Sequence, residues 1–235
     1  MDNSTVNHLK EEAAERAVQQ LESGMVVGLG SGTTATLAVD AIGKRVSQGL
    51  RITGVPTSEK TAAQARGLNI PLIELGDTVA IDITIDGADE VETGTLNLIK
   101  GGGGNQLREK LVAVASARLL IVVDETKVVS QLGSRFAIPV EVVQFGWQTT
   151  AKRLRNLGAN PRLRTEAGGQ AFVTDGGNYI LDCAYGPIAS PGVLQNELDS
   201  VVGVVEHGLF IGIAWQAIVG GTNAVTVLHP DARQP

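Results

Sequence analysis

The stretch MVVGLGSGTTATLAVDAIGKRV (residues 25–46) decides the fold of this chain. Residues 25–30 form a short apolar run, as expected of a strand, and residues 33–46 repeat apolar residues with the period of a helix. The glycine-rich turn between them begins with Gly28 and Gly30. A strand that enters a helix through such a turn opens many α/β folds that bind nucleotides or phosphate groups. We therefore predict an α/β protein.

Strands and helices continue to alternate through residue 127. Short runs of Val, Ile and Leu predict strands, and periodic apolar residues predict the helices that separate them. This order predicts right-handed βαβ units and a mostly parallel, doubly wound, Rossmann-like sheet. The further expected strands are residues 51–57, 70–75, 79–87 and 119–127, and the helices among them are residues 58–67 and 106–118.

The helix expected at residues 106–118 has one apolar stripe. Leu107 and Leu111, with Val114 and Ala115, recur at helical spacing and are expected to face the core. Glu109 lies off this stripe and near the preceding loop, where the positive end of the helix dipole helps to keep a carboxylate ionised. Taken alone, Glu109 has the features of an ordinary surface residue.

The character of the sequence changes near residue 133. An expected strand at 138–145 and helix at 147–158 are followed by a hairpin signal at 175–177, which is typical of a small α+β unit with an antiparallel sheet. The apolar run 208–221 is expected to return to the first unit. We predict a Rossmann-like catalytic domain of residues 1–132 plus 207–235 and a small α+β (ferredoxin-like) domain of residues 133–206 with a role in oligomerisation.

Charge and composition exclude several classes of protein. The net charge is −6, whereas a nucleic-acid-binding protein needs a basic face, so no nucleic-acid partner is expected. Cys183 is the only cysteine, which rules out an intramolecular disulfide and a cysteine-based zinc site. His8, His207 and His229 lie far apart and lack the spacing of metal ligands. We predict no metal and no cofactor.

The sequence also lacks the signs of export or of a membrane anchor. Residues 1–16 are polar and acidic, unlike a signal peptide or a transit peptide. No apolar run reaches the roughly 18 residues that a membrane span needs. We expect a cytoplasmic protein without a membrane partner.

The glycine-rich turn at residues 28–34 is suited to hold a phosphate. Backbone N–H groups and a helix N-terminus attract anions, and the hydroxyls of Ser31, Thr33 and Thr34 add donors. A plain tight turn and a dinucleotide site are the alternatives. A dinucleotide site requires Gly or Ala where Thr33 stands and an acidic residue at the end of the next strand, where residues 56–58 read Pro-Thr-Ser. NAD is therefore not expected.

Two further segments follow the ends of strands. Residues 86–90 read Asp-Gly-Ala-Asp-Glu, a pattern compatible with a ligand site, a solvated acidic turn or a divalent-metal site. Lys100 precedes the glycines 101–104, which suit either close approach of a ligand or a flexible loop. Because the carboxyl ends of parallel strands open onto one crevice, these segments are expected to meet Glu109 and Lys127 there.

With these motifs the chain resembles the type A family of ribose-5-phosphate isomerases. The resemblance extends over nearly the whole chain. In one departure, KGGGGN stands where the family commonly has KGGGAA, and the spacing from Lys100 to Glu109 is unchanged. The matching motifs are GLGSGTTA (28–35), DGADE (86–90), KGGGG with REK (100–110), VVDETK (122–127), PVEV (139–142), TDGGNYILD (174–182) and GVVEHGLF (203–210).

The resemblance implies an activity and a set of roles. It implies interconversion of D-ribose 5-phosphate and D-ribulose 5-phosphate, in the non-oxidative branch of the pentose phosphate pathway, by a homodimer or homotetramer. The proton transfer would be metal-independent and pass through a cis-enediolate. Glu109 corresponds to the general base, Lys100 to the lysine beside the reacting oxygens, and Asp86 and Asp89 to carboxylates that contact the sugar. The other implied substrate-binding residues are Ser31, Gly32, Thr33, Thr34, Gly87, Ala88, Gly101, Gly102, Gly103 and Lys127.

Two other classes of function are alternatives to this interpretation. An amino-sugar phosphate deaminase or a CoA-transferase is the nearest rival enzyme, but a deaminase is expected to carry a catalytic His, and none of the three histidines lies in the four site segments. A sugar-phosphate sensor is the non-enzymatic rival. A sensor of that kind is expected to carry a basic helix-turn-helix ahead of the fold, whereas the first expected strand already begins at residue 25.

Overall fold

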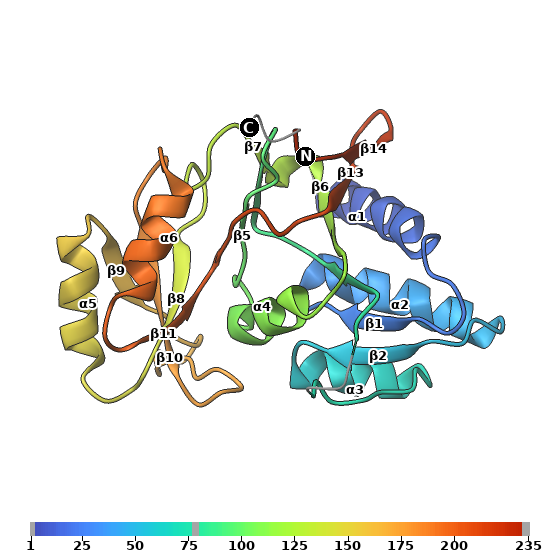
Figure 1. Ribbon diagram of the computed structural model, residues 1–235, viewed down its shortest axis with the longest axis horizontal. Helices are drawn as coiled ribbons and strands as arrows, with labels where there is room; N and C mark the ends of the chain where they lie inside the picture. The colour runs from blue at the N-terminus through green and yellow to red at the C-terminus, as the bar shows by residue number, and fades with distance from the viewer. Residues whose placement is uncertain (1–2, 77–79, 232–235) are drawn as a thin grey trace.

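The structure, a computed structural model, describes residues 3–76 and 80–231 (Figure 1). Six strands form the main sheet: β1 (Val26–Leu29), β2 (Thr53–Pro56), β3 (Ile83–Asp86), β6 (Leu119–Asp124), β13 (Gln216–Gly220) and β14 (Val225–Leu228). Their order is β14-β13-β6-β3-β1-β2, and all neighbours are parallel except β14, which is antiparallel to β13. The predicted α/β fold with a mostly parallel sheet is confirmed.

Strand β6 lies inside this sheet and is buried on both faces. Leu120 and Val122 contact the core beneath α1 (Asn3–Val18) and α2 (Thr33–Ser47), whereas Ile121 belongs to the core on the other face. Successive side chains of a strand point to opposite faces, so a strand covered on both faces requires an uninterrupted aliphatic run. The sequence of β6 meets that requirement through residues 119–123, which are all aliphatic, and all six residues of the strand are buried.

A second, mixed sheet of short strands covers part of the other face. It consists of β4 (Glu90–Glu92), β5 (Leu98–Ile99), β7 (Val128–Val129) and β12 (Leu209–Phe210), in the order β12-β5-β4-β7. None of these four short strands was recognised from the sequence as a separate strand. Strands of two or three residues carry too little periodicity to be recognised, and their partners lie far away in the sequence.

Residues 138–207 contain a third, antiparallel sheet in the order β11-β8-β10-β9, at the left of Figure 1. Helices α5 (Trp147–Asn156) and α6 (Pro191–Asp199) share its core, which also includes Ile99, Leu132 and Leu209. Residues that the sequence assigned to the first unit thus take part in the core of the second, and the division into domains at residues 133 and 206 stays an interpretation. The strands are β8 (Ile138–Val142), β9 (Asn160–Leu163), β10 (Tyr179–Ala184) and β11 (Val204–His207).

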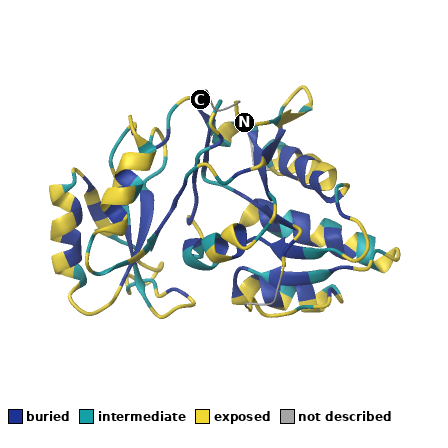
Figure 2. Ribbon diagram, viewed as in Figure 1, coloured by how far each residue is buried: buried dark blue, intermediate teal, exposed yellow. Residues whose placement is uncertain are grey.

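Burial follows this layered arrangement. Figure 2 shows buried strands in both units and exposed outer faces on α5, α6 and the helix α3 (Glu59–Gly67). Among the helices of the described residues, none combines the length and apolar character that crossing a membrane would require.

The strand expected at residues 70–75 is not formed. Leu72 makes only an isolated bridge to Gly54 at the edge of the main sheet, and Ile73 and Leu75 are exposed. This segment lies at the edge of the sheet, where a strand has only one neighbour to pair with. An apolar composition does not show whether such a segment forms a full strand. The strand expected at 79–87 is observed as β3, and residue 79 lies outside the described residues.

The apolar stripe predicted for residues 106–118 is also wrong. Helix α4 (Gln106–Val114), which lies between the two units in Figure 1, leaves Leu111 and Val114 49% and 62% exposed. Its buried residues include Glu109 and Val112. In a short helix, apolar residues three and four positions apart do not show which face is buried. Here the buried Lys100 pairs with Glu109, which favours burial of the face that carries Glu109.

Candidate active site

A cavity lies where β1, β3 and β6 end and the glycine run begins. The residues predicted for the substrate site come together here, except for Asp86, which lies beneath the cavity and is 1% exposed. The carboxyl ends of parallel strands meet at one edge of a sheet, which explains the convergence. The lining residues are Ser31, Gly32, Thr33, Thr34, Gly87, Ala88, Asp89, Lys100, Gly101, Gly102, Gly103, Glu109 and Lys127.

The turn after β1 is packed directly against Asp86. The backbone N–H groups of Ser31 and Gly87 donate to Asp86 Oδ1 at 3.2 and 2.7 Å. A Cβ atom on Gly30 would lie 2.2 Å from that oxygen, so only glycine permits this approach. The turn then reaches Gly32, whose φ of 96° precedes the open N-terminus of α2. Gly32, Thr33 and Thr34 line the cavity, and the N–H groups in the first turn of a helix favour an anion.

The Ser31 hydroxyl does not serve the cavity as the sequence analysis expected. It lies in a buried cluster, 2.7 Å from Thr57 Oγ1, 2.8 Å from Ser58 Oγ and 3.1 Å from Thr61 Oγ1. A hydroxyl has one donor and two acceptor sites, so these three partners occupy its capacity. Ser31 therefore presents its backbone to the cavity, and its side chain ties the turn to α3.

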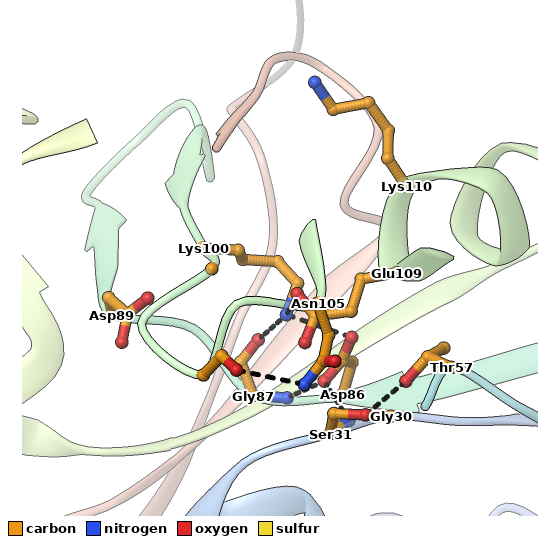
Figure 3. A network of polar contacts seen from close by, with 12 residues as sticks. Gly30, Ser31, Thr57, Asp86, Gly87, Asp89, Lys100, Asn105, Glu109 and Lys110 are labelled. Carbon is orange, nitrogen blue, oxygen red and sulfur yellow. Dashed lines mark hydrogen bonds and ion pairs between the residues drawn. The ribbon is translucent and has the colours of Figure 1, made fainter. Parts of the chain in front are cut away.

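Three charged side chains converge at the cavity floor, two that line the cavity and one beneath them (Figure 3). Lys100 Nζ lies 2.9 Å from Asp86 Oδ2 and 3.1 Å from Glu109 Oε2, and it donates to the Gly87 carbonyl at 2.7 Å. All three side chains are at most 5% exposed. A buried charge is tolerated only when it is paired, and here one ammonium group serves two carboxylates.

This arrangement changes the pKa values of the three groups. Burial raises the pKa of Asp86, and burial raises the pKa of Glu109 to about 8, with the nearby Asp86 adding to the effect and Lys100 opposing it. Burial alone would lower the pKa of Lys100, but the two carboxylates raise it above its ordinary value. The expectation that the helix N-terminus keeps the Glu109 carboxylate readily ionised is not met, because burial raises its pKa.

The glycine run is a fixed loop rather than a flexible one. The N–H of Gly102 donates to Asp89 Oδ2 at 2.8 Å, and the N–H of Gly104 donates to the Gly101 carbonyl at 2.9 Å. Asp89 lies apart from the Lys100 cluster, on the opposite side of the loop in Figure 3. Its carboxylate is thereby held at the wall of the cavity.

The acidic segment 86–90 is not a solvated turn. Glu90 is 1% exposed and accepts hydrogen bonds from the backbone N–H groups of Gly133, Arg135 and Phe136 at 2.6–2.8 Å. Its role is structural, because it secures the chain that leads from the mixed sheet into the second unit.

Lys10 lies next to the site, in contact with the lining residue Thr33, and was not expected there from the sequence. It comes from α1, is 9% exposed, and places Nζ 3.3 Å from Thr33 Oγ1 and 3.8 Å from Asp124 Oδ2. A lysine in a polar amphipathic helix is typical of a solvated face, so no local signal pointed to it. Only the packing of α1 across the sheet brings its charge behind the phosphate-compatible turn.

No metal-ligand cluster was found at the cavity within the described residues. One group with suitable ligand atoms, Asp199, Glu206 and His207, lies elsewhere. Lys110 Nζ is bonded to the Glu206 carboxylate, and the Leu209 N–H donates to His207 Nδ1 at 3.1 Å, so the group is satisfied by protein partners. Burial lowers the pKa of His207 to about 4, which keeps the ring neutral.

Comparisons with known proteins agree, and the relatives and solved structures match nearly the whole chain. Residues 53–224 match the family model of Ribose 5-phosphate isomerase A (phosphoriboisomerase A). The ribose-5-phosphate isomerase A of Gloeobacter violaceus is 56% identical over 224 residues, covering 95% of this chain and 97% of the relative. The solved ribose 5-phosphate isomerase A of Methanocaldococcus jannaschii has a TM-score of 0.90 at 38% identity, covering 94% of this chain and 98% of its own. A solved D-ribose-5-phosphate isomerase in complex with phospho-erythronic acid has a TM-score of 0.92 at 34% identity, covering 97% of this chain and 100% of its own.

Proposed function

The chain belongs to the ribose-5-phosphate isomerase A family, and on that premise we propose that it interconverts D-ribose 5-phosphate and D-ribulose 5-phosphate through a cis-enediolate, with Glu109 as the general base. The observation that carries the mechanism is the contact of Glu109 with Lys100 at the floor of the cavity. A carboxylate and an ammonium group side by side can move a proton and stabilise the negative charge that results.

The phosphate of the substrate binds at the α2 end of the cavity. The open helix N-terminus at Gly32 and Thr33 offers N–H donors, Lys127 lines the same cavity, and the Lys10 ammonium lies behind Thr33. Two lysines and a helix dipole supply the positive potential that a dianion requires. The net charge of −6 does not oppose this, because local groups set the potential inside the cavity.

The reacting end of the sugar lies over Glu109. Its carboxylate removes the proton from C2 of the aldose and returns it to C1, and a hydroxyl proton moves from O2 to O1 in the same conversion. The carboxylate suits both halves of the reaction, because the group that accepts the proton then donates it. Lys100 and the glycine N–H groups stabilise the enediolate oxygens, and Asp89 accepts hydrogen bonds from sugar hydroxyls.

Asp86 has a different role from the one the resemblance implied. It does not line the cavity, and its Oδ1 already accepts two backbone hydrogen bonds. We assign it to holding Lys100 in place, 2.9 Å away, and to raising the pKa of Glu109 through its charge. It thus acts through the catalytic pair and does not touch the substrate.

The proposed reaction uses no metal ion, because Lys100 supplies the positive charge that a metal would otherwise provide. The test is the rate of ribulose 5-phosphate formation from ribose 5-phosphate in excess EDTA. We expect full turnover, with phospho-erythronic acid as a competitive inhibitor. Activity that disappears in EDTA and returns with magnesium would overturn the metal-independent mechanism, and absence of turnover under all conditions would overturn the isomerase function itself.

The pH dependence of kcat/KM reports the state of Glu109 in the free enzyme. Because its pKa is raised to about 8 and the base must be ionised, kcat/KM is expected to fall as pH decreases below about 8. The midpoint belongs to the coupled Asp86–Glu109 pair. The phosphate group of the substrate titrates with a pKa of about 6, so its effect on the pH profile lies well below that of Glu109 and can be told apart from it. A profile that stays flat from pH 9 down to about 6 would contradict the raised pKa.

We further propose a homodimer or homotetramer in the non-oxidative branch of the pentose phosphate pathway, with residues 133–206 contributing to self-association. Exposed apolar side chains on that unit support the idea, since Phe145 is 96% and Val202 75% exposed. Large exposed apolar groups are costly in water and are common at interfaces.

A further inference from the structure

Arg164, which follows β9 in the second unit, reaches the glycine run of the cavity. One of its terminal nitrogens, Nη1, donates to the Gly101 carbonyl at 2.9 Å and to the Gly102 carbonyl at 3.1 Å. The other edge of the guanidinium makes a two-pronged ion pair with Asp182 on β10, with Nε 3.1 Å from Oδ2. One side chain therefore connects the antiparallel sheet to the loop that lines the cavity.

The position of Arg164 is fixed from several directions. Its backbone N–H donates to the Ile180 carbonyl, and its own carbonyl accepts from Phe172 N–H, both at 2.9 Å. Its side chain is only 14% exposed, and the guanidinium lies 5.9 Å from the centre of the Phe172 ring. A planar guanidinium held by a bidentate carboxylate has little freedom, so the two glycine carbonyls are bound by a rigid donor.

Phe172 secures the other end of the same run. A Cβ atom on Gly104 would lie 2.5 Å from the Phe172 ring, and Gly104 has a φ of 82°. Only glycine combines that backbone conformation with such close approach of an aromatic ring. The second unit thus fixes both ends of the run Gly101–Gly104.

Fixing the carbonyls also fixes the N–H groups. In a planar trans peptide the C=O and N–H bonds point in opposite directions. The peptide whose carbonyl belongs to Gly101 carries the N–H of Gly102, which is aimed at Asp89. The peptide whose carbonyl belongs to Gly102 carries the N–H of Gly103, which must point away from Arg164, and Gly103 lines the cavity.

We propose that Arg164 is a positioning residue for the isomerisation, which orients these two peptides so that the N–H of Gly102 holds Asp89 and the N–H of Gly103 donates to the substrate oxygen that becomes negative. The inference rests on the proposed function. The positive charge on the carbonyl side also polarises both peptides, which strengthens their N–H groups as donors to a developing oxyanion.

The test compares wild type with Arg164→Met, Arg164→Lys and the control Arg162→Met. Arg162 lies on β9 and is exposed, so the control removes the same charge two residues away. For Arg164→Met we expect kcat to fall about tenfold, as when an outer partner of a site residue is lost, with a smaller change in KM. Arg164→Lys should recover only part of this, because one ammonium group cannot reach Asp182 and both carbonyls together.

Inhibition constants separate positioning from a general structural effect. Phospho-erythronic acid carries a planar carboxylate at the end where the enediolate would form, whereas inorganic phosphate occupies only the α2 end. Arg164→Met is expected to raise the inhibition constant of phospho-erythronic acid about tenfold, the same factor by which kcat falls. The inhibition constant of inorganic phosphate should stay unchanged. Equal weakening of both inhibitors, or a kcat equal to that of Arg162→Met, would overturn the proposal.

Two further results keep the test independent of folding and of the assigned reaction. If Arg164→Met does not fold, Asp182→Asn is tested in its place. We then expect a smaller loss of kcat, together with weaker binding of phospho-erythronic acid and unchanged binding of inorganic phosphate. An Asp182→Asn variant equal to wild type in both readouts would then count against the proposal. A wild type without isomerase activity refutes the proposed function, whereas an active wild type with an unaffected Arg164→Met variant refutes only this inference.

Discussion

Replacing Glu109 by Gln is expected to reduce kcat by about 10²–10⁴ with little change in KM, because general base catalysis contributes a factor of that size. Gln keeps the shape of the side chain and can still accept a hydrogen bond from Lys100, but it cannot take the proton from C2. The measurement is steady-state turnover of ribose 5-phosphate. Glu59→Gln is the matched control, since Glu59 is exposed and binds Arg108, the neighbour of Glu109.

The same variant should not be less stable than wild type at neutral pH. The pKa of Glu109 is raised in the folded protein, from 4.5 to about 8, so its contribution to stability is fully present below pH 4.5 and is lost as pH rises through about 8. Gln remains neutral throughout, so the Tm of the variant relative to wild type should increase across that window. A folded Glu109→Gln enzyme with wild-type kcat would show that another group is the base.

Replacing Lys100 by Met is expected to reduce kcat/KM by at least about 10², the loss that follows removal of one oxyanion donor. It should also destabilise the fold by about 3–5 kcal/mol, because Asp86 and Glu109 lose the buried ammonium group that pairs with both of them. Without that cation the pKa values of Asp86 and Glu109 rise further. A raised folded pKa stabilises at low pH and ceases to do so as pH increases, so the Tm deficit of the variant should grow with pH.

A double variant separates the two effects of Lys100. Asp86→Asn combined with Lys100→Met removes one uncompensated charge and keeps an oxygen for the N–H groups of Ser31 and Gly87. We expect it to recover Tm but not kcat/KM. Lys60→Met on α3 is the control, since Lys60 is exposed. Recovery of kcat/KM in the double variant would show that Lys100 acts only by neutralising Asp86.

The sequence predicted much of the site because chain order in a parallel sheet determines which segments become neighbours. The turn after β1, the Asp-Gly-Ala-Asp segment after β3 and Lys127 after β6 all follow strand ends, and such ends open at one edge. The glycine run could be connected to them through the family resemblance. These features are encoded locally, in residues that are contiguous along the chain.

Other features could not be read from neighbouring residues. Glu109 has the sequence context of a surface residue, yet α4 presents it to Lys100 and leaves Leu111 exposed. Lys10 and Arg164 reach the site from α1 and from the second unit, 23 and about 62 residues from the groups they contact. Periodicity predicts that a helix has a buried face, but it does not show which charged groups lie opposite that face.

The sequence by itself predicted the α/β class and a mostly parallel sheet, and the family resemblance implied a set of substrate-site residues, most of which line the cavity. Only the tertiary structure decided that Asp86 lies below the cavity, that the Ser31 hydroxyl is engaged in a buried cluster, and that Glu109 has a pKa near 8. The physical reason is that secondary structure and the handedness of its connections depend on the local sequence and on chirality. The pKa of a carboxylate depends instead on its burial and on charged groups from distant parts of the chain.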